Sequence, residues 1–335
     1  MNDAQGVARS TGGVVVHRAA VLGHPVAHSL SPTLHRAAYS ALGLADWRYD
    51  AVDVTADQLA EYVTSLDETW TGLSLTMPLK QTVLPLLDHI EPLAAVVGAV
   101  NTVLIDGAGA RRTLVGANTD VYGIVSAVGE GFSPSVNTEG SPKTAVLLGA
   151  DATTDAVLAA GARTAAVLGA GATAASTLAA LAQLGCPTPV VYVRSLGRIG
   201  PLMRASHRMG VEPQFALLSA AADELAGFDI VVSTLPCHAA DPVAQALGAA
   251  AAATSSAATP ARAGVLLDVV YEPRPTALSV AWEHTGGVVV GGERMLLHQA
   301  VEQVRLMTGR IAPVDAMEHA LAIQLANRLA HQLGV

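Results

Sequence analysis

Short runs rich in valine, leucine and isoleucine alternate along the chain with longer alanine- and leucine-rich segments, beginning at Val14. The short runs have the length and composition of buried strands, and the longer segments have the periodicity of helices. Such alternation is typical of α/β proteins, in which most neighbouring strands are parallel. The pattern therefore predicts an α/β fold.

The first part of the chain, up to Asp120, predicts strands, helices and one hairpin. The hairpin consists of NTVLID, the turn DGAG and TLVGANTD, within residues 101–120. The other expected elements are strands at 18–23 and 47–54, a strand that ends within TGLSLTMPLK (71–80), and helices over Ser31–Leu42, near Asp57–Leu66 and from Pro78.

After Asp120 the pattern becomes a regular series of strand–helix units, which favours a parallel sheet. The expected strands are Thr164–Leu168, Val190–Val193, Phe228–Ser233, Val265–Val270 and GGVVVGG (286–292), and two helices follow, roughly Glu293–Thr308 and Val314–Leu333. The low-complexity segment Ala249–Thr259 is expected to be a helix end followed by a loop.

One internal repeat lies in this second part. Thr144–Ala160 aligns with Thr164–Ala180 at an offset of 20, with 10 of 17 positions identical. Alanine-rich composition raises the number of chance matches, so coincidence is the alternative to a local duplication. We favour the duplication and predict that residues 143–161 are an insertion.

Composition and charge exclude several classes of protein. Only 14% of the 335 residues are charged and the net charge is −9, which argues against a general nucleic-acid binder. The uncharged stretch Thr164–Gly185 is interrupted by glycines and polar residues, and it predicts a strand, a turn and a helix rather than a membrane span. We see no signal peptide at the N-terminus.

The metal-binding residue types show no ligand spacing. The two cysteines, Cys186 and Cys237, are far apart, and the eleven histidines form no metal motif. We therefore expect no metal, and we expect a cytoplasmic protein that binds neither membrane nor nucleic acid.

The segment VLGAGATA (167–174) predicts a dinucleotide-binding loop. Gly169 and Gly171 follow an apolar strand and precede a helix, where glycines allow a tight turn and a close approach of backbone N–H groups to a pyrophosphate. A glycine loop alone is weak evidence for dinucleotide binding, and a turn that only serves packing is the alternative. The first copy of the repeat has Asp151 where the second has Gly171, so only the second is expected to bind.

The next strand indicates which dinucleotide binds. An NAD site would have an acidic residue near its end for the ribose 2′-hydroxyl. This chain has VVYVRSLGR, with Arg194 at that position, Ser195 next and Arg198 one turn later. A guanidinium suits a 2′-phosphate, so the pattern favours NADP over NAD, with ordinary surface arginines as the alternative.

Two further segments carry hydroxyls and a lysine. In GHPVAHSLSPTLH (23–35), Ser31 followed by Pro32 predicts a helix N-cap, whereas Ser29 is not needed for capping. Two hydroxyls at a helix start would suit a carboxylate ligand. Lys80 follows a helix start at Pro78, and a surface lysine is the alternative to a catalytic one.

Taken together, these motifs resemble the shikimate dehydrogenase family from about Val21 to the C-terminus. The motifs, in order, are GHPVAHSLSPTLH (23–35), GLSLTMPLK (72–80), GAVNT (98–102), GANTD (116–120), LGAGATA (168–174), VRSLGR (193–198), STLP (233–236), DVVYEPRPT (268–276) and GGERMLLHQA (291–300). Their identity, order and most of their spacings match the family.

The resemblance implies roles for individual residues. Lys80 and Asp120 resemble the catalytic pair, in which lysine exchanges a proton with the substrate and aspartate orients it. The implied substrate-binding residues are Ser29 and Ser31 for the carboxylate, Tyr271 near it, and Thr76, Asn101 and Gln299 for the hydroxyls. The implied cofactor-binding residues are Gly169, Ala170, Gly171, Ala172, Thr173, Arg194, Ser195, Arg198, Thr234 and Gly292. The three histidines near the site, His24, His28 and His35, are expected to be structural.

The resemblance also implies an organisation and an activity. A substrate domain of residues 14–120 and 293–335 is expected to be completed by the C-terminal helices, with a Rossmann-type NADP domain, residues 121–292, inserted between its parts. The implied reaction is the reversible NADPH-dependent reduction of 3-dehydroshikimate to shikimate. A homodimer is possible.

The chain departs from the family at a few positions. Ser74 and Arg36 stand where the family usually has asparagine, and Val193 precedes Arg194 where asparagine is usual. A quinate or dual quinate/shikimate dehydrogenase is the alternative activity, although Ser31 and Arg194 favour shikimate and NADP. A folate-type methylene dehydrogenase would not explain the two serines and Gln299, and a non-catalytic NADP-binding protein would be expected to lack Lys80 or Asp120.

Overall fold

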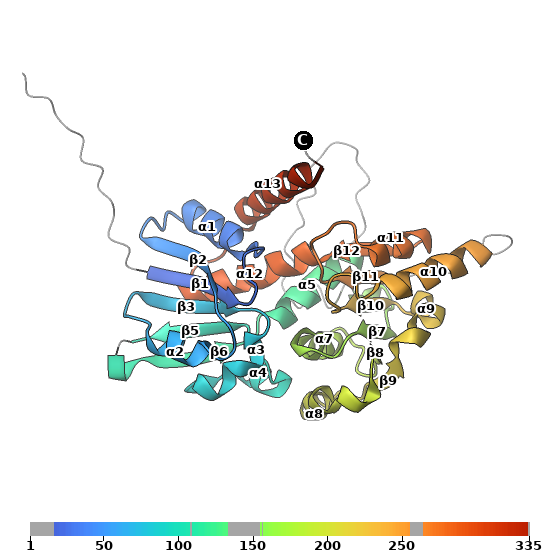
Figure 1. Ribbon diagram of the computed structural model, residues 1–335, viewed down its shortest axis with the longest axis horizontal. Helices are drawn as coiled ribbons and strands as arrows, with labels where there is room; N and C mark the ends of the chain where they lie inside the picture. Colours follow the sequence, from blue (N-terminus) through green and yellow to red (C-terminus); the bar gives the residue numbers. More distant parts are fainter. Residues whose placement is uncertain (1–16, 108, 133–154, 156, 255–263, 334–335) are drawn as a thin grey trace, which may run out of the picture.

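The chain forms two α/β units, each built around a six-stranded sheet, which lie side by side in the computed structural model (Figure 1). The structure describes residues 17–107, 109–132, 155, 157–254 and 264–333. The prediction of an α/β fold with two units is confirmed. Most of the predicted insertion at 143–161 lies outside the described residues, as does the end of the segment 249–259.

The first sheet is mixed, with strand order β2-β1-β3-β5-β6-β4. Its strands are β1 (His17–Gly23), β2 (Trp47–Asp53), β3 (Trp70–Leu75), β4 (His89–Ile90), β5 (Thr102–Asp106) and β6 (Thr113–Ala117). β1 is parallel to β2 and to β3, whereas β5 is antiparallel to β3 and β6. The β5–β6 pair is the predicted hairpin; the two-residue strand β4 was not predicted.

Helices from both ends of the chain complete this first unit. They are α1 (Ser31–Ala41), α2 (Leu59–Thr64), α3 (Leu79–Thr82), α4 (Pro92–Val97), α12 (Gly292–Thr308) and α13 (Val314–Leu333). One hydrophobic core combines Val21 of β1 and Leu34 of α1 with Leu297 of α12 and Leu321 of α13. The C-terminal helices therefore pack on the N-terminal sheet.

The second sheet is entirely parallel, with strand order β12-β11-β10-β7-β8-β9. Its strands are β7 (Ala165–Leu168), β8 (Val190–Val193), β9 (Gln214–Leu217), β10 (Ile230–Ser233), β11 (Val265–Asp268) and β12 (Val288–Gly291). The order reverses between β7 and β10, and ligands of open parallel sheets bind at such a point, beyond the carboxyl ends of the strands.

The helices of the second unit cover both faces of this sheet (Figure 1). They are α5 (Asp120–Phe132), α7 (Ala172–Gln183), α8 (Gly200–Met209), α9 (Ala221–Glu224), α10 (Asp241–Thr254) and α11 (Ala277–His284). No helix among these residues or elsewhere in the described part of the chain is long and apolar enough to cross a membrane.

Helix α5 joins the two units and packs closely against α12. A Cβ added at Gly123 would lie 2.8 Å from the carbonyl oxygen of Met295 and 3.0 Å from Cβ of Gln299, so only glycine allows this approach. Near the other end of α5, Glu130 accepts two hydrogen bonds from Arg294, both at 2.7 Å, and contacts His298 at 2.6 Å.

The ion pairs around Glu130 reinforce this contact. Burial alone would raise the pKa of Glu130, but the bonds with His298 and Arg294 outweigh it and lower the pKa to about 2. Arg294 also pairs with Glu318 of α13. Helices α5, α12 and α13 are therefore joined by charged contacts as well as by packing.

Candidate active site

The candidate active site lies at one edge of the first sheet. Lys80 lies in the short helix that follows β3, Asn101 directly precedes β5, and Asp120 follows β6 and begins α5. Because β5 runs opposite to β3 and β6, its amino end meets their carboxyl ends. The sheet topology therefore brings together three residues that are far apart in sequence.

Lys80 and Asp120 form a buried ion pair. The Lys80 Nζ donates to Oδ2 of Asp120 at 2.6 Å, and the side chains are 14% and 5% exposed. Two opposite charges this sheltered from water need close contact to offset their lost hydration. The Lys80 side chain keeps a small exposed fraction, and proton exchange with a ligand requires such access.

Asn101 holds the other oxygen of Asp120. Its Oδ1 accepts hydrogen bonds from the backbone N–H of Thr119 at 2.8 Å and from the hydroxyl of Thr102 at 3.0 Å. These donors direct the amide nitrogen toward Oδ1 of Asp120, 2.8 Å away. The Oε1 of Gln299 lies 3.4 Å from the same nitrogen. Four of the predicted site residues, Lys80, Asn101, Asp120 and Gln299, are thus brought together.

Thr76 and the loop after β1 lie beside this group. The backbone N–H of His24 donates to the carbonyl of Met77 at 2.9 Å, so the loop that contains the serines contacts the loop that leads to Lys80. A Cβ at Gly23 would come within 2.2 Å of the Thr76 methyl group. Glycine at position 23 is therefore needed for the two loops to meet.

The prediction that Ser31 caps helix α1 is wrong. Helix α1 begins at Ser31 itself and its N-cap is Leu30, without a side-chain capping bond. The Ser29 hydroxyl instead accepts from the backbone N–H of Ser31, at 3.3 Å. The predicted helix start at Ser31 is correct, and only its capping role is wrong, because Pro32 is the second residue of the helix rather than the first.

Ser31 also forms hydrogen bonds with two buried ring side chains, those of His35 and Tyr49. The buried His35 ring bonds to the Ser31 carbonyl at 2.9 Å and stacks on Tyr49. Burial lowers the pKa of His35 to about 4, so its ring is neutral near pH 7, as a structural histidine requires. The Tyr49 hydroxyl hydrogen-bonds with Ser31 and donates to Ser74 at 2.6 Å.

The departures from the family pattern have visible contacts. Ser74 passes the hydrogen bond on to Oε1 of Gln303, at 2.9 Å, and Gln303 donates to the hydroxyl of Thr102 at 3.0 Å. Arg36 donates to the Tyr49 carbonyl at 2.8 Å. Neither Tyr49 nor Gln303 was singled out by sequence; their contacts depend on strands and helices that meet only in the fold.

Two neighbouring tyrosines offer a matched test of this buried network. Tyr49→Phe should lower the free energy of unfolding by about 1 kcal/mol, because a satisfied buried hydroxyl is removed. Tyr39→Phe should leave it unchanged or raise it, since the Tyr39 hydroxyl is buried without a partner among the described residues. Urea denaturation measures both. Equal losses in the two variants would contradict this account.

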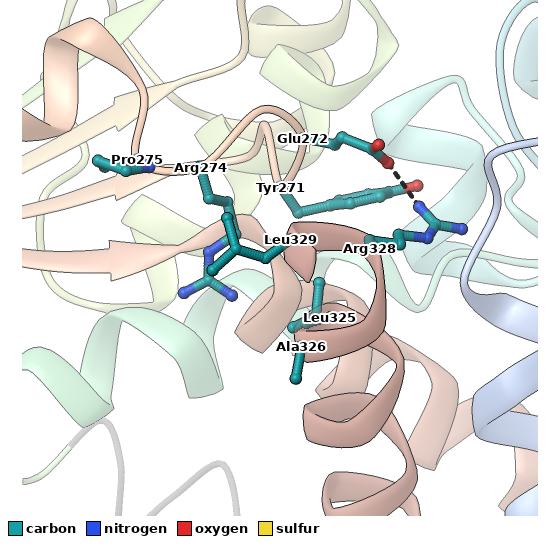
Figure 2. Close-up of a pocket in the computed structure, with 8 residues that line it drawn as sticks. All are labelled: Tyr271, Glu272, Arg274, Pro275, Leu325, Ala326, Arg328 and Leu329. Atoms are coloured by element: carbon teal, nitrogen blue, oxygen red, sulfur yellow. Dashed lines mark hydrogen bonds and ion pairs between the residues drawn. The ribbon is translucent and has the colours of Figure 1, made fainter. Parts of the chain in front are cut away.

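Tyr271 lies in the loop after β11, opposite the C-terminal helix α13. It packs against the core shared by α1, α12 and α13, and burial raises the pKa of its hydroxyl. Figure 2 shows its ring extending toward Arg328, with Glu272 beside both. Residues of this loop and of α13 together line a cavity of about 400 Å³.

The glycine loop lies at the carboxyl end of β7, as predicted. Gly169 has a φ of +113°, and a Cβ there would lie 2.5 Å from the Thr234 hydroxyl oxygen. Gly171 differs: its φ of −83° suits any residue, and an added Cβ would meet nothing within 4 Å. Gly169 is therefore required by the fold, whereas Gly171 leaves open space at the N-terminus of α7, which fits a pyrophosphate.

The remaining predicted cofactor residues lie at the same edge of the second sheet. Arg194, Ser195 and Arg198 follow β8 and are exposed, and in the described part of the chain neither arginine forms an ion pair. Free guanidinium groups next to the glycine loop fit a 2′-phosphate. Thr234 follows β10, where its hydroxyl donates to the Leu168 carbonyl at 2.9 Å. Gly292 begins α12, and a Cβ there would lie 2.2 Å from the Val269 carbonyl oxygen.

No group of three or more potential metal ligands occurs among the residues that the structure describes. What those residues do form is an open glycine loop at the carboxyl end of a parallel sheet and, on the adjoining unit, a sheltered lysine–aspartate ion pair. This division is that of a dehydrogenase that holds a nicotinamide dinucleotide on one unit and its substrate on the other.

Comparison with known proteins gives the family. The family model described as "Shikimate dehydrogenase substrate binding domain" matches residues 21–103, and "Shikimate 5'-dehydrogenase C-terminal domain" matches residues 292–322. A shikimate dehydrogenase (NADP(+)) of Geobacter sp. (strain M21) is 35% identical, with coverage of 91% of this chain and 94% of the relative. The chain belongs to the shikimate dehydrogenase family.

Solved structures similar to this chain belong to the same family. The crystal structure of Mycobacterium tuberculosis shikimate dehydrogenase is 35% identical, with a TM-score of 0.71 and coverage of 92% of this chain and 99% of that one. The Thermus thermophilus enzyme in complex with NADP(H) and shikimate is 28% identical, with a TM-score of 0.68 and coverage of 91% and 98%. A quinate dehydrogenase from Corynebacterium glutamicum in complex with NAD is 26% identical, with a TM-score of 0.70 and coverage of 91% and 98%.

Proposed function

We propose that this protein catalyses the reversible NADPH-dependent reduction of 3-dehydroshikimate to shikimate, in the biosynthesis of chorismate and the aromatic amino acids. The observation that carries the proposal is the sheltered Lys80–Asp120 pair, held by Asn101 at one edge of the first sheet. Two relatives that are 35% and 30% identical to this chain, and that match it over 94% and 93% of their own length, are named shikimate dehydrogenase (NADP(+)).

In this proposal Lys80 is the proton donor and acceptor. NADPH, when bound, supplies the hydride to the ketone carbon. The ketone oxygen then gains negative charge, which Lys80 neutralises by donating a proton; in the reverse direction Lys80 removes it. Asp120 orients the ammonium through Oδ2, and Asn101 fixes the carboxylate through Oδ1.

The substrate would lie against the loops that surround this pair. Ser29 and Ser31 would bind its carboxylate, with Tyr271 near them, and Thr76, Asn101 and Gln299 would bind its hydroxyls. The contact between Asn101 and Gln299 supports a shared hydroxyl subsite. Under the same proposal residues 14–120 and 293–335 hold the substrate and residues 121–292 hold NADP.

The cofactor assignment is tested at Arg194. Because Arg194 is proposed to bind the 2′-phosphate, Arg194→Ala should weaken NADP binding by roughly 1.5–3 kcal/mol and leave NAD almost untouched. Titration of the protein with each dinucleotide measures the two affinities. Equal losses for NADP and NAD would show that Arg194 acts elsewhere; Arg204→Ala, at an exposed position of α8, is the control.

Initial rates test the activity itself. We expect oxidation of shikimate with NADP to exceed the rates with quinate or with NAD. A preference for quinate and NAD would instead establish the alternative activity. That alternative is considered because a quinate dehydrogenase is among the similar structures. Absence of turnover with either acid would overturn the proposal.

Two broader features belong to the proposal. A cytoplasmic location is supported by the free, exposed thiol of Cys237, which suits a reducing compartment. Homodimer formation stays a prediction, and analytical ultracentrifugation would test it.

A further inference from the structure

Arg328, on the C-terminal helix α13, contacts two loops at once. Its Nη1 donates to the backbone carbonyl of His28 at 3.1 Å and to Oε2 of Glu272 at 2.5 Å. The side chain is only 21% exposed. Figure 2 shows the guanidinium beside the hydroxyl end of Tyr271, with the Glu272 carboxylate on the same side.

These two loops come from different units of the protein. His28 directly precedes Ser29 in the loop after β1 of the first sheet, and Glu272 directly follows Tyr271 in the loop after β11 of the second. Helix α13 itself packs on α1 of the first unit. The guanidinium therefore connects the two units at the end of the site where the serines and Tyr271 lie.

The chemistry of arginine suits such a connection. A guanidinium has five N–H donors in a fixed planar arrangement, so it can hold a carbonyl and a carboxylate together. Its contact with the His28 carbonyl restrains the residue next to Ser29, and its contact with Glu272 restrains the residue next to Tyr271. The partial burial of the pair strengthens both contacts beyond those of an ordinary surface ion pair.

We propose that Arg328 is a positioning residue for the carboxylate end of the substrate: it fixes the serine loop and the Tyr271 loop relative to each other. This inference rests on the proposed function. It assigns Arg328 no contact with the substrate; the effect passes through Ser29, Ser31 and Tyr271.

The test compares Arg328→Gln with a matched ion pair elsewhere. In Arg328→Gln we expect the KM for shikimate to rise about tenfold, the low end of what loss of a charge-assisted hydrogen bond costs. We expect kcat to stay within about twofold and the KM for NADP to stay unchanged, because the affected groups only bind the substrate. Arg305→Gln, which removes an exposed pair within α12, should change none of these.

Three further measurements separate positioning from general stabilisation. Arg328→Lys should recover part of the lost affinity, since one charged donor remains. Glu272→Gln should raise the KM for shikimate in the same direction, and the double variant should lose less than the sum of the two. With shikimate methyl ester, which lacks the anionic group, Arg328→Gln should lower kcat/KM less than it does with shikimate.

The outcomes are decisive. The proposal is overturned if Arg328→Gln lowers kcat while the KM for shikimate is unchanged, if it raises the KM for NADP equally, or if it matches Arg305→Gln in every constant. If Arg328→Gln fails to fold, the Arg328→Lys and Glu272→Gln results decide in the same way. A wild-type protein that does not oxidise shikimate would instead overturn the proposed function.

Discussion

Replacing Lys80 with alanine is expected to lower kcat by roughly 10²- to 10⁴-fold, the usual contribution of a general acid–base group. The KM for shikimate should change much less, because Ser29, Ser31 and the other proposed ligands remain. The Asp120 carboxylate keeps its bond from Asn101, so the site should retain its shape. Steady-state kinetics with shikimate and NADP measures both constants.

The chain offers an unusually clean control for this variant. Lys80 and Lys143 are its two lysines, and Lys143 lies outside the described residues. Lys143→Ala is expected to leave kcat unchanged. A Lys80→Ala protein with near-normal turnover and a normal melting temperature would show that another group exchanges the proton.

Gly171→Asp is expected to abolish NADP binding while the protein stays folded. Position 171 is the N-cap of α7, where aspartate is a favoured residue, and a Cβ added there meets no protein atom within 4 Å. The new carboxylate would, however, stand where the pyrophosphate should lie. Like charges about 4 Å apart near a protein surface repel by roughly 4 kcal/mol, or about 10³-fold in affinity.

Two controls separate charge from bulk and one copy of the repeat from the other. Gly171→Asn has the same size without the charge and should weaken NADP binding less, as measured by calorimetric titration. Asp151→Gly, in the first copy of the repeat, should leave the affinity nearly unchanged. Normal NADP affinity in Gly171→Asp would refute the assignment of this loop.

The parts of the fold that follow local rules could be predicted from the sequence. The hairpin of β5 and β6, the strands on both sides of the glycine loop and the C-terminal helices have clear periodicity and turn residues. Strand β9 was missed, because QFAL has only four residues and so short an apolar run does not distinguish a strand from part of a helix. The start of β10 was predicted two residues too early and the end of β11 two residues too late.

The candidate site divides in the same way. Lys80, Asp120 and Asn101 lie in recognisable motifs, so their proximity could be expected from the family resemblance. Tyr49, Gln303 and Arg328 lie outside any motif, and each acquires its role by contact with residues far away in sequence: Tyr49 reaches Ser74 from another strand, and Arg328 reaches His28 from 300 positions away. Such contacts arise from the packing of complete elements, which local sequence does not encode.

The close approach of α5 and α12 at Gly123 has a mechanical consequence. The first residue of α5 is Asp120, and α12 carries Gln299, so two groups of the site stand on helices in backbone contact. The Arg294–Glu130 pair joins the same two helices near the C-terminal end of α5 and the N-terminal end of α12. These two helices therefore form one rigid element. If the dinucleotide-binding sheet moves toward or away from the substrate, the carboxylate of Asp120 and the amide of Gln299 keep their spacing, whereas their distance from the nicotinamide changes.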